Sequence, residues 1–158
     1  MKLQDIVEEN ALIPSLESTT RDEVVTELVD ALVASKAVDS DNRDTLIESI
    51  LERERRGSTG FGKGVAVPHV KHDCIKKMVA TIGVSAKGVD FNALDRQSVY
   101  ALVLLLSPVD QPEEHLKAME IIFGNLSQDT FRRFLRQVGT VDDIITLIQE
   151  ADNQQLVG

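Results

Sequence analysis

The run of apolar residues from Val99 to Leu106 constrains the fold more than any other segment of the chain. Its eight residues include no charged side chain. A membrane-spanning helix needs about 20 consecutive apolar residues, so the run predicts no membrane insertion. Its length instead suits a strand that is buried on both faces. Such a strand requires a covering layer on each side of its sheet.

The helical spacing of apolar residues elsewhere in the chain predicts the helices that form those layers. Helices are expected at about 20–36, 41–56, 110–123, 127–139 and 140–148, with strands at 65–67, 78–85 and 99–106 and a turn-rich connection at 88–95. A short amphipathic stretch (3–7) and an extended segment (11–16) precede them. The interleaving predicts a single α/β domain over residues 1–152, with helices covering a central sheet. Residues 153–158 are expected to form a frayed tail.

Several helix starts are predicted from capping residues. A Ser, Thr or Asp followed three residues later by an acid is typical of a helix N-terminus. The pairs are Thr20 with Glu23, Asp110 with Glu113 and Thr140 with Asp143. Ser127 is expected to cap the helix at 127–139.

Cysteine usage and the first residues bear on the compartment. The single cysteine, Cys74, has no partner for an internal disulfide bond, which favours a reducing, cytoplasmic setting. Asp5, Glu8 and Glu9 interrupt the first ten residues, where a secretory signal would have an apolar segment.

The charge of the chain is unevenly distributed. There are 17 Lys and Arg residues against 26 Asp and Glu residues, a net charge of −9, which disfavours nucleic acid as a partner. Residues 53–72 nevertheless hold five basic side chains and only one acidic side chain, Glu54. A basic segment within an acidic protein indicates a site for an anion.

The basic segment contains a loop with four glycines, Gly57-Ser-Thr-Gly-Phe-Gly-Lys-Gly64. Gly57, Gly62 and Lys63 match the first part of a nucleotide-binding P-loop, but Gly64 occupies the position of the magnesium-binding Ser or Thr. The loop also runs from a helix to a strand, the reverse of a P-loop. It is therefore expected to provide tight turns, or bare backbone N–H groups that approach an anion closely.

His69 follows Val-Ala-Val-Pro at the end of the predicted short strand. Pro68 fixes the backbone there, so the imidazole is held in one direction. With Lys63 and Lys71 nearby, such an imidazole suits a base, a metal ligand or a nucleophile toward phosphorus. A hydrogen-bonded structural histidine is the alternative.

Two other kinds of chemistry fit the residues less well. His69, His72 and Cys74 suggest a metal site, but the two histidines fall on opposite faces of an extended chain and only the distant His115 remains as a further ligand. No metal or cofactor is therefore expected. Ser58 and Thr59 lack the elbow motif of a serine hydrolase, so their hydroxyls are expected to bond to the loop backbone or to a bound phosphate.

Taken together, these segments resemble the type-2 enzyme IIA domains of the bacterial phosphotransferase system, which include fructose, mannitol and nitrogen-regulatory forms. The resemblance lies in Arg53-Glu54, the loop 57–62, Gly64-Val-Ala-Val-Pro-His69, Gly88-Val-Asp-Phe91, Leu94-Asp95 and Leu104-Leu-Leu-Ser-Pro108 through to His115-Leu116. It covers nearly the whole chain in the family's order. It implies an α/β sandwich with a mixed central sheet flanked by helices.

The resemblance also implies roles for individual residues. His69 would accept a phosphoryl group from the phosphohistidine of the carrier HPr or its nitrogen-branch relative, with His115 stabilising the phosphate and Arg53 stabilising charge. The loop residues Ser58, Thr59, Gly60, Gly62 and Gly64 would bind the phosphate. Phe61, an aromatic side chain among glycines, is a candidate for docking the carrier, and packing back onto the domain is its alternative.

The fate of the phosphate separates the functional hypotheses. The Gly-Ser-Thr-Gly loop and the lack of a fused IIB or IIC segment favour a nitrogen-type regulator that binds target proteins. A sugar-specific enzyme IIA that passes phosphate to a IIB domain is the alternative. A binding module that is never phosphorylated, and a metal sensor using His69, His72 and Cys74, are the remaining hypotheses.

Overall fold

The structure, a computed structural model, describes residues 1–156. Its helices and short 3-10 turns are α1 (Leu3–Ile6), η1 (Glu9–Ala11), α2 (Arg21–Ala34), η2 (Ser40–Asn42), α3 (Arg43–Arg55), α4 (Pro112–Leu126), α5 (Asp129–Arg136) and α6 (Val141–Asp152). Its strands are β1 (Val65–Ala66), β2 (His69–Lys71), β3 (Val79–Val89) and β4 (Val99–Ser107). No helix within this range is long and apolar enough to span a membrane.

The predicted buried strand, β4, is the centre of a mixed sheet. β1 and β2 pair in parallel with successive parts of one edge of β4, with Val65 opposite Ala101 and His69 opposite Leu105. β3 pairs antiparallel along the other edge. The expected α/β class with a mixed central sheet is confirmed.

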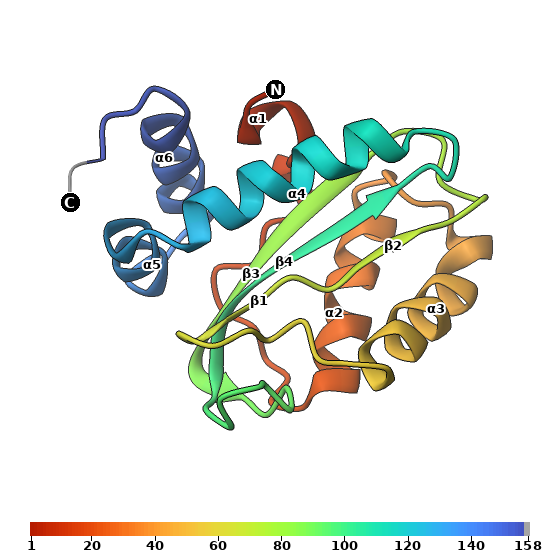
Figure 1. The fold of residues 1–158 in the computed structure, drawn as a ribbon, viewed down its shortest axis with the longest axis horizontal. Coiled ribbons are helices and arrows are strands. Elements are labelled where there is room, and N and C mark those ends of the chain that lie inside the picture. Colours follow the sequence, from red (N-terminus) through yellow and green to blue (C-terminus); the bar gives the residue numbers. More distant parts are fainter. Residues whose placement is uncertain (157–158) are drawn as a thin grey trace.

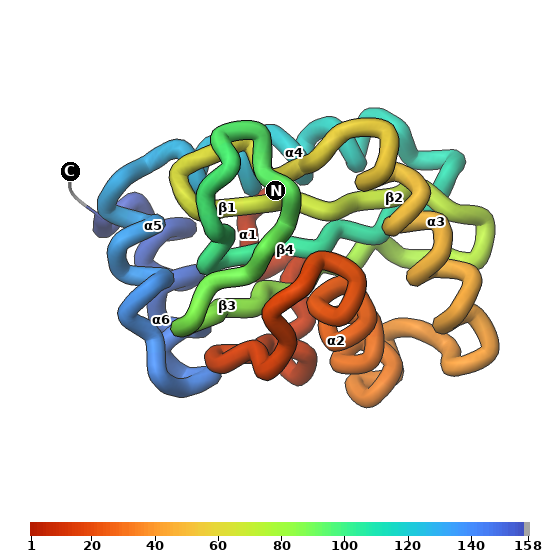
Figure 2. Tube along the Cα trace, turned by 90° about the horizontal axis from the view of Figure 1, so that it is seen from below, coloured from red at the N-terminus to blue at the C-terminus, as the bar shows by residue number. Residues whose placement is uncertain are grey.

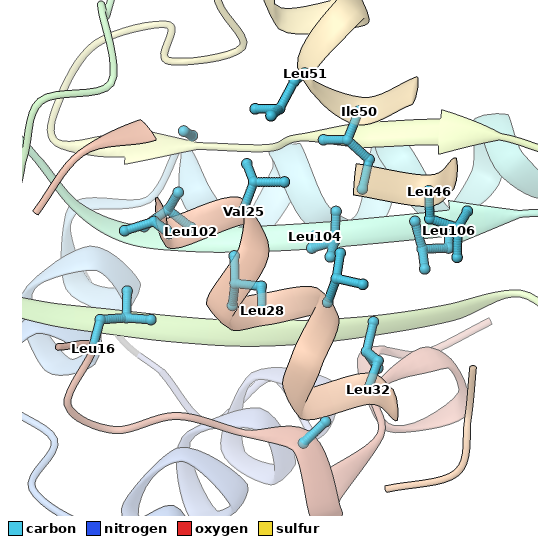
Figure 3. Packing of buried hydrophobic residues seen from close by; sticks show 14 of the residues in the cluster. Leu16, Val25, Leu28, Leu32, Leu46, Ile50, Leu51, Leu102, Leu104 and Leu106 are labelled. Carbon is cyan, nitrogen blue, oxygen red and sulfur yellow. The ribbon is translucent and has the colours of Figure 1, made fainter. Parts of the chain in front are cut away.

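Alternate residues of β4 face two separate cores, as the period of a strand requires. Leu102, Leu104 and Leu106 pack against α2 and α3 in the first core (Figure 3). Ala101, Val103 and Leu105 belong to the second core, which is covered by α1, α4, α5 and α6 (Figure 1). The central strand is thus buried on both faces, as the apolar run predicted.

Pro68 interrupts the edge strand but does not end it. The expected strand at 65–67 is β1, which ends at Ala66, and a further strand, β2, pairs with β4 directly after the proline. A proline is tolerated here because its missing N–H lies at a break in the ladder, while its carbonyl accepts from the Leu105 N–H at 3.0 Å. His69 is therefore the first residue of a strand rather than part of a loop.

β3 is longer than the sequence patterns predicted. The ladder is irregular between Val84 and Val89, and Val89 then pairs with Val99. The strand therefore continues into the segment that was expected to be a turn-rich connection. The N-terminal segment lies along the outer edge of β3 through isolated bridges such as Ile13 to Gly83. The expected extended segment at 11–16 begins inside the 3-10 turn, which includes Ala11, and the chain bends at Pro14 and Ser15. Figure 2 shows this segment beside β3.

Of the predicted caps, only the one before α6 has the expected reciprocal form. Thr140 accepts from the Asp143 N–H at 3.1 Å, and the Asp143 carboxylate accepts from the Thr140 N–H. Before α2, the Thr20 hydroxyl instead donates to the Glu23 carboxylate at 2.6 Å.

Two other predicted starts are displaced. α4 is preceded by Gln111 rather than Asp110, because Pro112 supplies the fixed φ of a first helical residue. Ser127 ends α4 instead of starting α5, since its hydroxyl donates back to the Gly124 carbonyl. α5 ends at Arg136, before Gly139.

The C-terminal residues lie beside α6. The N–H groups of 153–155 bond to carbonyls of that helix, and Leu156 packs against the second core. The frayed tail at 153–158 stays a prediction, and its residues 157–158 lie outside the described part of the chain.

Candidate functional site

The start of β2, the end of α3 and the start of α4 place three predicted site residues around one cleft. His69 opens β2, His115 lies in the first turn of α4, and Arg53 lies in the last turn of α3. The cleft has a volume of about 450 Å³ and is lined by Ser49, Glu52, Arg53, Arg56, His69, Val70, Lys71, His72 and His115. Its three fixed cations outnumber its single carboxylate, so the cleft attracts anions.

The two histidine rings are neighbours. Their centroids are 5.7 Å apart and their planes are inclined by 48°. The residues are far apart in sequence, and the parallel pairing of β2 with the end of β4 brings them together, since α4 begins soon after that strand.

The orientation of the His69 ring identifies its free nitrogen. Nδ1 lies 2.8 Å from the Val67 carbonyl oxygen. Because a carbonyl oxygen can only accept, the Nδ1 atom of neutral His69 carries the proton. The lone pair is then on Nε2.

The surroundings of His69 favour its neutral form. Burial lowers the pKa of His69 below its ordinary value of 6.5, and the positive charges of Arg53 and Lys71 lower it further. The hydrogen bond to Val67 and the charge of Glu54 act in the opposite direction. At neutral pH the imidazole is therefore uncharged and nucleophilic.

His115 is more enclosed than His69. Its side chain is buried, and its Nδ1 lies 2.6 Å from the Ser107 hydroxyl oxygen. Burial lowers its pKa, and the positive charge of Lys71, together with that of His69 whenever His69 is protonated, acts in the same direction. His115 is thus a second neutral imidazole beside the first.

Arg53 is held by the start of the glycine loop. Its Nη1 donates to the Gly57 carbonyl at 2.8 Å. This bond satisfies a carbonyl beyond the end of α3 and uses one of the five N–H donors of the guanidinium. Within residues 1–156 its other donors have no hydrogen-bond partner and can bind an anion in the cleft.

Residues 60–64 of the glycine loop do not line the cleft. The Gly60 carbonyl accepts from the Leu94 N–H at 2.8 Å, and Gly64 lies against Tyr100. Both contacts are near the start of β4, whereas His69 pairs near its end. Phosphate binding by Gly60, Gly62 and Gly64 stays a prediction that the cleft geometry does not support.

The hydroxyls of the loop bond within the protein. Ser58 donates to the Phe91 carbonyl at 3.2 Å and accepts from the Gly60 N–H at 3.0 Å. Thr59 donates to Glu54 from its hydroxyl at 2.6 Å and from its backbone N–H at 3.0 Å. The Ser58 hydroxyl thus bonds to backbone, which was one of the two expected alternatives, whereas the Thr59 hydroxyl bonds to a side-chain carboxylate.

Phe61 contacts the outer face of α4. Its ring centroid is 5.0 Å from that of Phe123, with the planes inclined by 52°. Phe61 is half-buried against the second core. It therefore packs onto the domain and leaves part of its ring accessible.

Sequence reasoning did not assign roles to Glu54 and Ser107. Glu54 is only 2% exposed and anchors Thr59, whose carbonyl accepts from the Val67 N–H at 3.4 Å. A hydrogen-bonded path thus runs from a buried carboxylate to the carbonyl that orients His69. The spacing along the helix could have indicated that Glu54 is buried, because it lies four residues after Ile50 and eight after Leu46, on the buried face of α3.

The suggested metal ligands do not converge. The His72 Nδ1 accepts from the Cys74 N–H at 3.1 Å, a local turn contact. Within residues 1–156, no group of three His, Cys, Asp or Glu side chains is arranged to hold a metal ion.

An α/β sandwich with two neighbouring neutral histidines in a cationic cleft can bind an anion and offers it a nucleophilic nitrogen. Residues 5–151 match the family described as "Phosphoenolpyruvate-dependent sugar phosphotransferase system, EIIA 2", and the chain belongs to this family. The predicted resemblance is confirmed.

The relatives include both functional branches. The chain is 35% identical over 132 residues to a nitrogen regulatory protein of Pseudomonas aeruginosa, covering 83% of this chain and 84% of that protein. It is 31% identical over 134 residues to a fructose-specific EIIA component of Haloferax volcanii, covering 83% and 86%. It also matches a fructose-specific EIIABC component of Bacillus subtilis at 29% identity over 96% of this chain, but spans only 24% of that protein.

Solved structures have the same fold. The nitrogen regulatory IIA protein of Neisseria meningitidis superposes with a TM-score of 0.82 at 25% identity, covering 91% of this chain and 97% of that chain. The mannitol enzyme IIA of Escherichia coli, solved in complex with phosphorylated enzyme IIB, superposes with a TM-score of 0.75 at 17% identity, covering 91% and 99%.

Proposed function

We propose that this protein is a phosphohistidine carrier of the phosphotransferase system, and that His69 Nε2 is the atom that is phosphorylated. The observation that carries the proposal is the contact of His69 Nδ1 with the Val67 carbonyl, which leaves the lone pair on Nε2 of a neutral ring. Family membership implies a phosphotransfer role. The donor would be the phosphohistidine of HPr or its nitrogen-branch relative.

The transfer needs no proton movement at His69. The Nε2 lone pair forms a bond to phosphorus as the donor's N–P bond breaks, and the donor nitrogen recovers the electron pair. The Nδ1 proton stays on its hydrogen bond to Val67, which helps to stabilise the charge that develops on the ring. Arg53 would neutralise the phosphoryl oxygens, in keeping with a reaction that depends mainly on positioning and charge stabilisation.

Intact-mass spectrometry tests this assignment directly. The protein is incubated with phosphoenolpyruvate, enzyme I and HPr or the nitrogen-type carrier. We expect an acid-labile gain of one phosphate on the wild type and none on His69→Ala. His72→Ala is the matched control, since His72 lines the same cleft, and it should be labelled like the wild type. A label that persists on His69→Ala would contradict the assignment.

We propose that the phosphate signal is mainly regulatory, as in nitrogen-type proteins, and that the protein acts in the cytoplasm. The similarity to nitrogen regulatory proteins in sequence and fold supports this branch. The alternative, a role in sugar transport, is supported by the similarity to fructose-specific relatives. Adding a fructose-type IIB domain to the phosphorylated protein separates the two, because rapid loss of phosphate to IIB would favour sugar transport.

We also propose that the carrier docks on the exposed face of α4 beside the cleft. Leu116, next to His115, is 60% exposed, and Phe123 with Phe61 continues the apolar surface along the helix. Leu116→Ser should raise the KM for the carrier and leave the fold intact. Leu94→Ser is the control, since Leu94 is 69% exposed at the opposite end of β4. Equal KM values for the two variants would exclude this surface.

A further inference from the structure

Ser107 connects the central strand to the second histidine. It is the last residue of β4 and has no exposed surface. It pairs with Lys71 of β2, and its carbonyl accepts from the His72 N–H at 3.0 Å. Figure 1 shows that the end of β4, the start of α4 and β2 lie on the same side of the molecule. The hydroxyl of Ser107 is therefore held in a rigid part of the sheet.

The direction of the hydrogen bond between Ser107 and His115 follows from the partners that are available. A serine hydroxyl has one proton to donate, and a buried hydroxyl that donates to no acceptor is destabilising. In the described part of the chain, the only hydrogen-bond partner of this hydroxyl is His115 Nδ1, at 2.6 Å. The hydroxyl donates, so Nδ1 is the acceptor and carries no proton.

The proton of His115 is then on the other ring nitrogen. Burial and the positive charge of Lys71 lower the pKa of this imidazole and keep it neutral at neutral pH. A neutral imidazole that accepts at Nδ1 must carry its proton at Nε2. Because Nδ1 is bonded to Ser107, the Nε2–H group is the part of His115 that can bond to a ligand in the cleft.

The neighbouring ring has the opposite tautomer. His69 carries its proton at Nδ1, on the Val67 carbonyl, and its lone pair at Nε2. The two rings, 5.7 Å apart, thus present a lone pair and an N–H group to the same cleft. A phosphoryl group requires both kinds of partner, a nucleophile for phosphorus and a donor for an oxygen.

We propose that Ser107 is a positioning residue that holds His115 as a neutral Nε2–H donor, so that the phosphoryl group on His69 receives a hydrogen bond from its neighbour. The proposal rests on the proposed function for its phosphoryl group. The tautomer itself does not depend on that function. Ser107 acts only through His115 and does not touch the phosphate.

Nitrogen NMR of the histidine rings tests the tautomer in the unphosphorylated protein at neutral pH. We expect the wild type to show His115 with an unprotonated Nδ1 and a protonated Nε2, and His69 with the reverse. In Ser107→Ala the His115 signals should move toward the Nδ1-protonated form. Ser85→Ala is the matched control, because Ser85 is a buried serine of β3 that bonds to Gly88, and it should leave the His115 signals unchanged.

Phosphorylation kinetics test the consequence. Ser107→Ala should slow the acceptance of phosphate by about tenfold, the effect of losing one hydrogen bond to a charged group, with the KM for the carrier unchanged. Ser107→Thr keeps the hydroxyl and should restore both the tautomer and the rate. Should Ser107→Ala fail to fold, the wild-type spectrum and Ser107→Thr still decide the proposal.

The outcomes separate this proposal from the proposed function. A wild-type His115 that is protonated at Nδ1 would overturn the proposal, even if His69 is phosphorylated normally. A tautomer change in Ser107→Ala without any change in rate would overturn the positioning role. If the wild type accepts no phosphate at all, the proposed function fails and the positioning role fails with it.

Discussion

At the scale of single residues, the chemistry depends on a neutral His69. Burial lowers its pKa below 6.5, with contributions from Arg53 and Lys71 that Glu54 and the Val67 carbonyl partly oppose. His115 is the titratable group that faces it from α4. A group with a lowered pKa gains its proton only at lower pH, so the nucleophilic form persists through pH 6.5.

The rate of phosphate acceptance should therefore be constant from neutral pH to below 6.5, and should fall only as the pH drops through the lowered pKa of His69. Single-turnover rates with a phosphorylated carrier, measured across this range, check the profile. The carrier's own titration is controlled by measuring its transfer to an unrelated acceptor. A decline in rate that begins above pH 6.5 would contradict a lowered pKa of His69.

Arg53 is the residue whose charge should matter most for the phosphoryl oxygens. Arg53→Ala should slow transfer by about tenfold to hundredfold, because a charge-assisted hydrogen bond to phosphate is lost. Arg55→Ala is the matched control, since Arg55 is exposed on the same helix and does not line the cleft. Equal rates for the two variants would show that Arg56 and Lys71 are sufficient.

At the scale of elements, the glycine loop is a structural connection between α3 and β1. Gly64 has a φ of +78°, and a Cβ there would approach the Tyr100 ring at 3.3 Å. A left-handed conformation is unfavourable for residues with a Cβ. The loop therefore needs glycine at this position for its turn, independently of any ligand.

Gly64→Ala should lower the free energy of unfolding by about 1–2 kcal/mol, while phosphate acceptance by the folded fraction stays unchanged. Chemical denaturation and the intact-mass assay measure the two effects separately. Gly57→Ala is the control, because a Cβ there meets nothing within 4 Å. Loss of phosphorylation with unchanged stability would instead support the predicted phosphate-binding role of the loop.

At the scale of the whole molecule, β4 holds the two cores together. Leu104 is completely buried between the sheet and the helices α2 and α3 (Figure 3). Leu104→Ala removes contacts and leaves a cavity, so it should reduce the free energy of unfolding by about 2–5 kcal/mol. Denaturation should show a change below about 0.5 kcal/mol for the exposed control Leu94→Ala. A small effect at Leu104 would mean that the core collapses around the cavity.

Residue type and spacing were enough to predict the class of fold, the central strand and the two histidines that line the cleft. Hydropathy and its periodicity are properties of the local sequence, so the run at 99–106 predicted a strand buried on both faces, and the helical spacing elsewhere predicted helices that cover it. The segments around Arg53, His69 and His115 resembled those of the family in their order. These inferences needed only residue type and spacing along the chain.

Which groups meet at the cleft depends on the packing of the sheet and helices and could not be predicted from spacing along the chain. Loop residues next to His69 in sequence, such as Gly64, lie near the other end of β4, because the chain advances about 3.3 Å per residue along a strand. His115, far away in sequence, lies beside His69 because β2 pairs in parallel with the end of β4. The tautomers depend on Val67 and Ser107, since hydrogen bonds form between atoms that are close in space, whatever their separation along the chain.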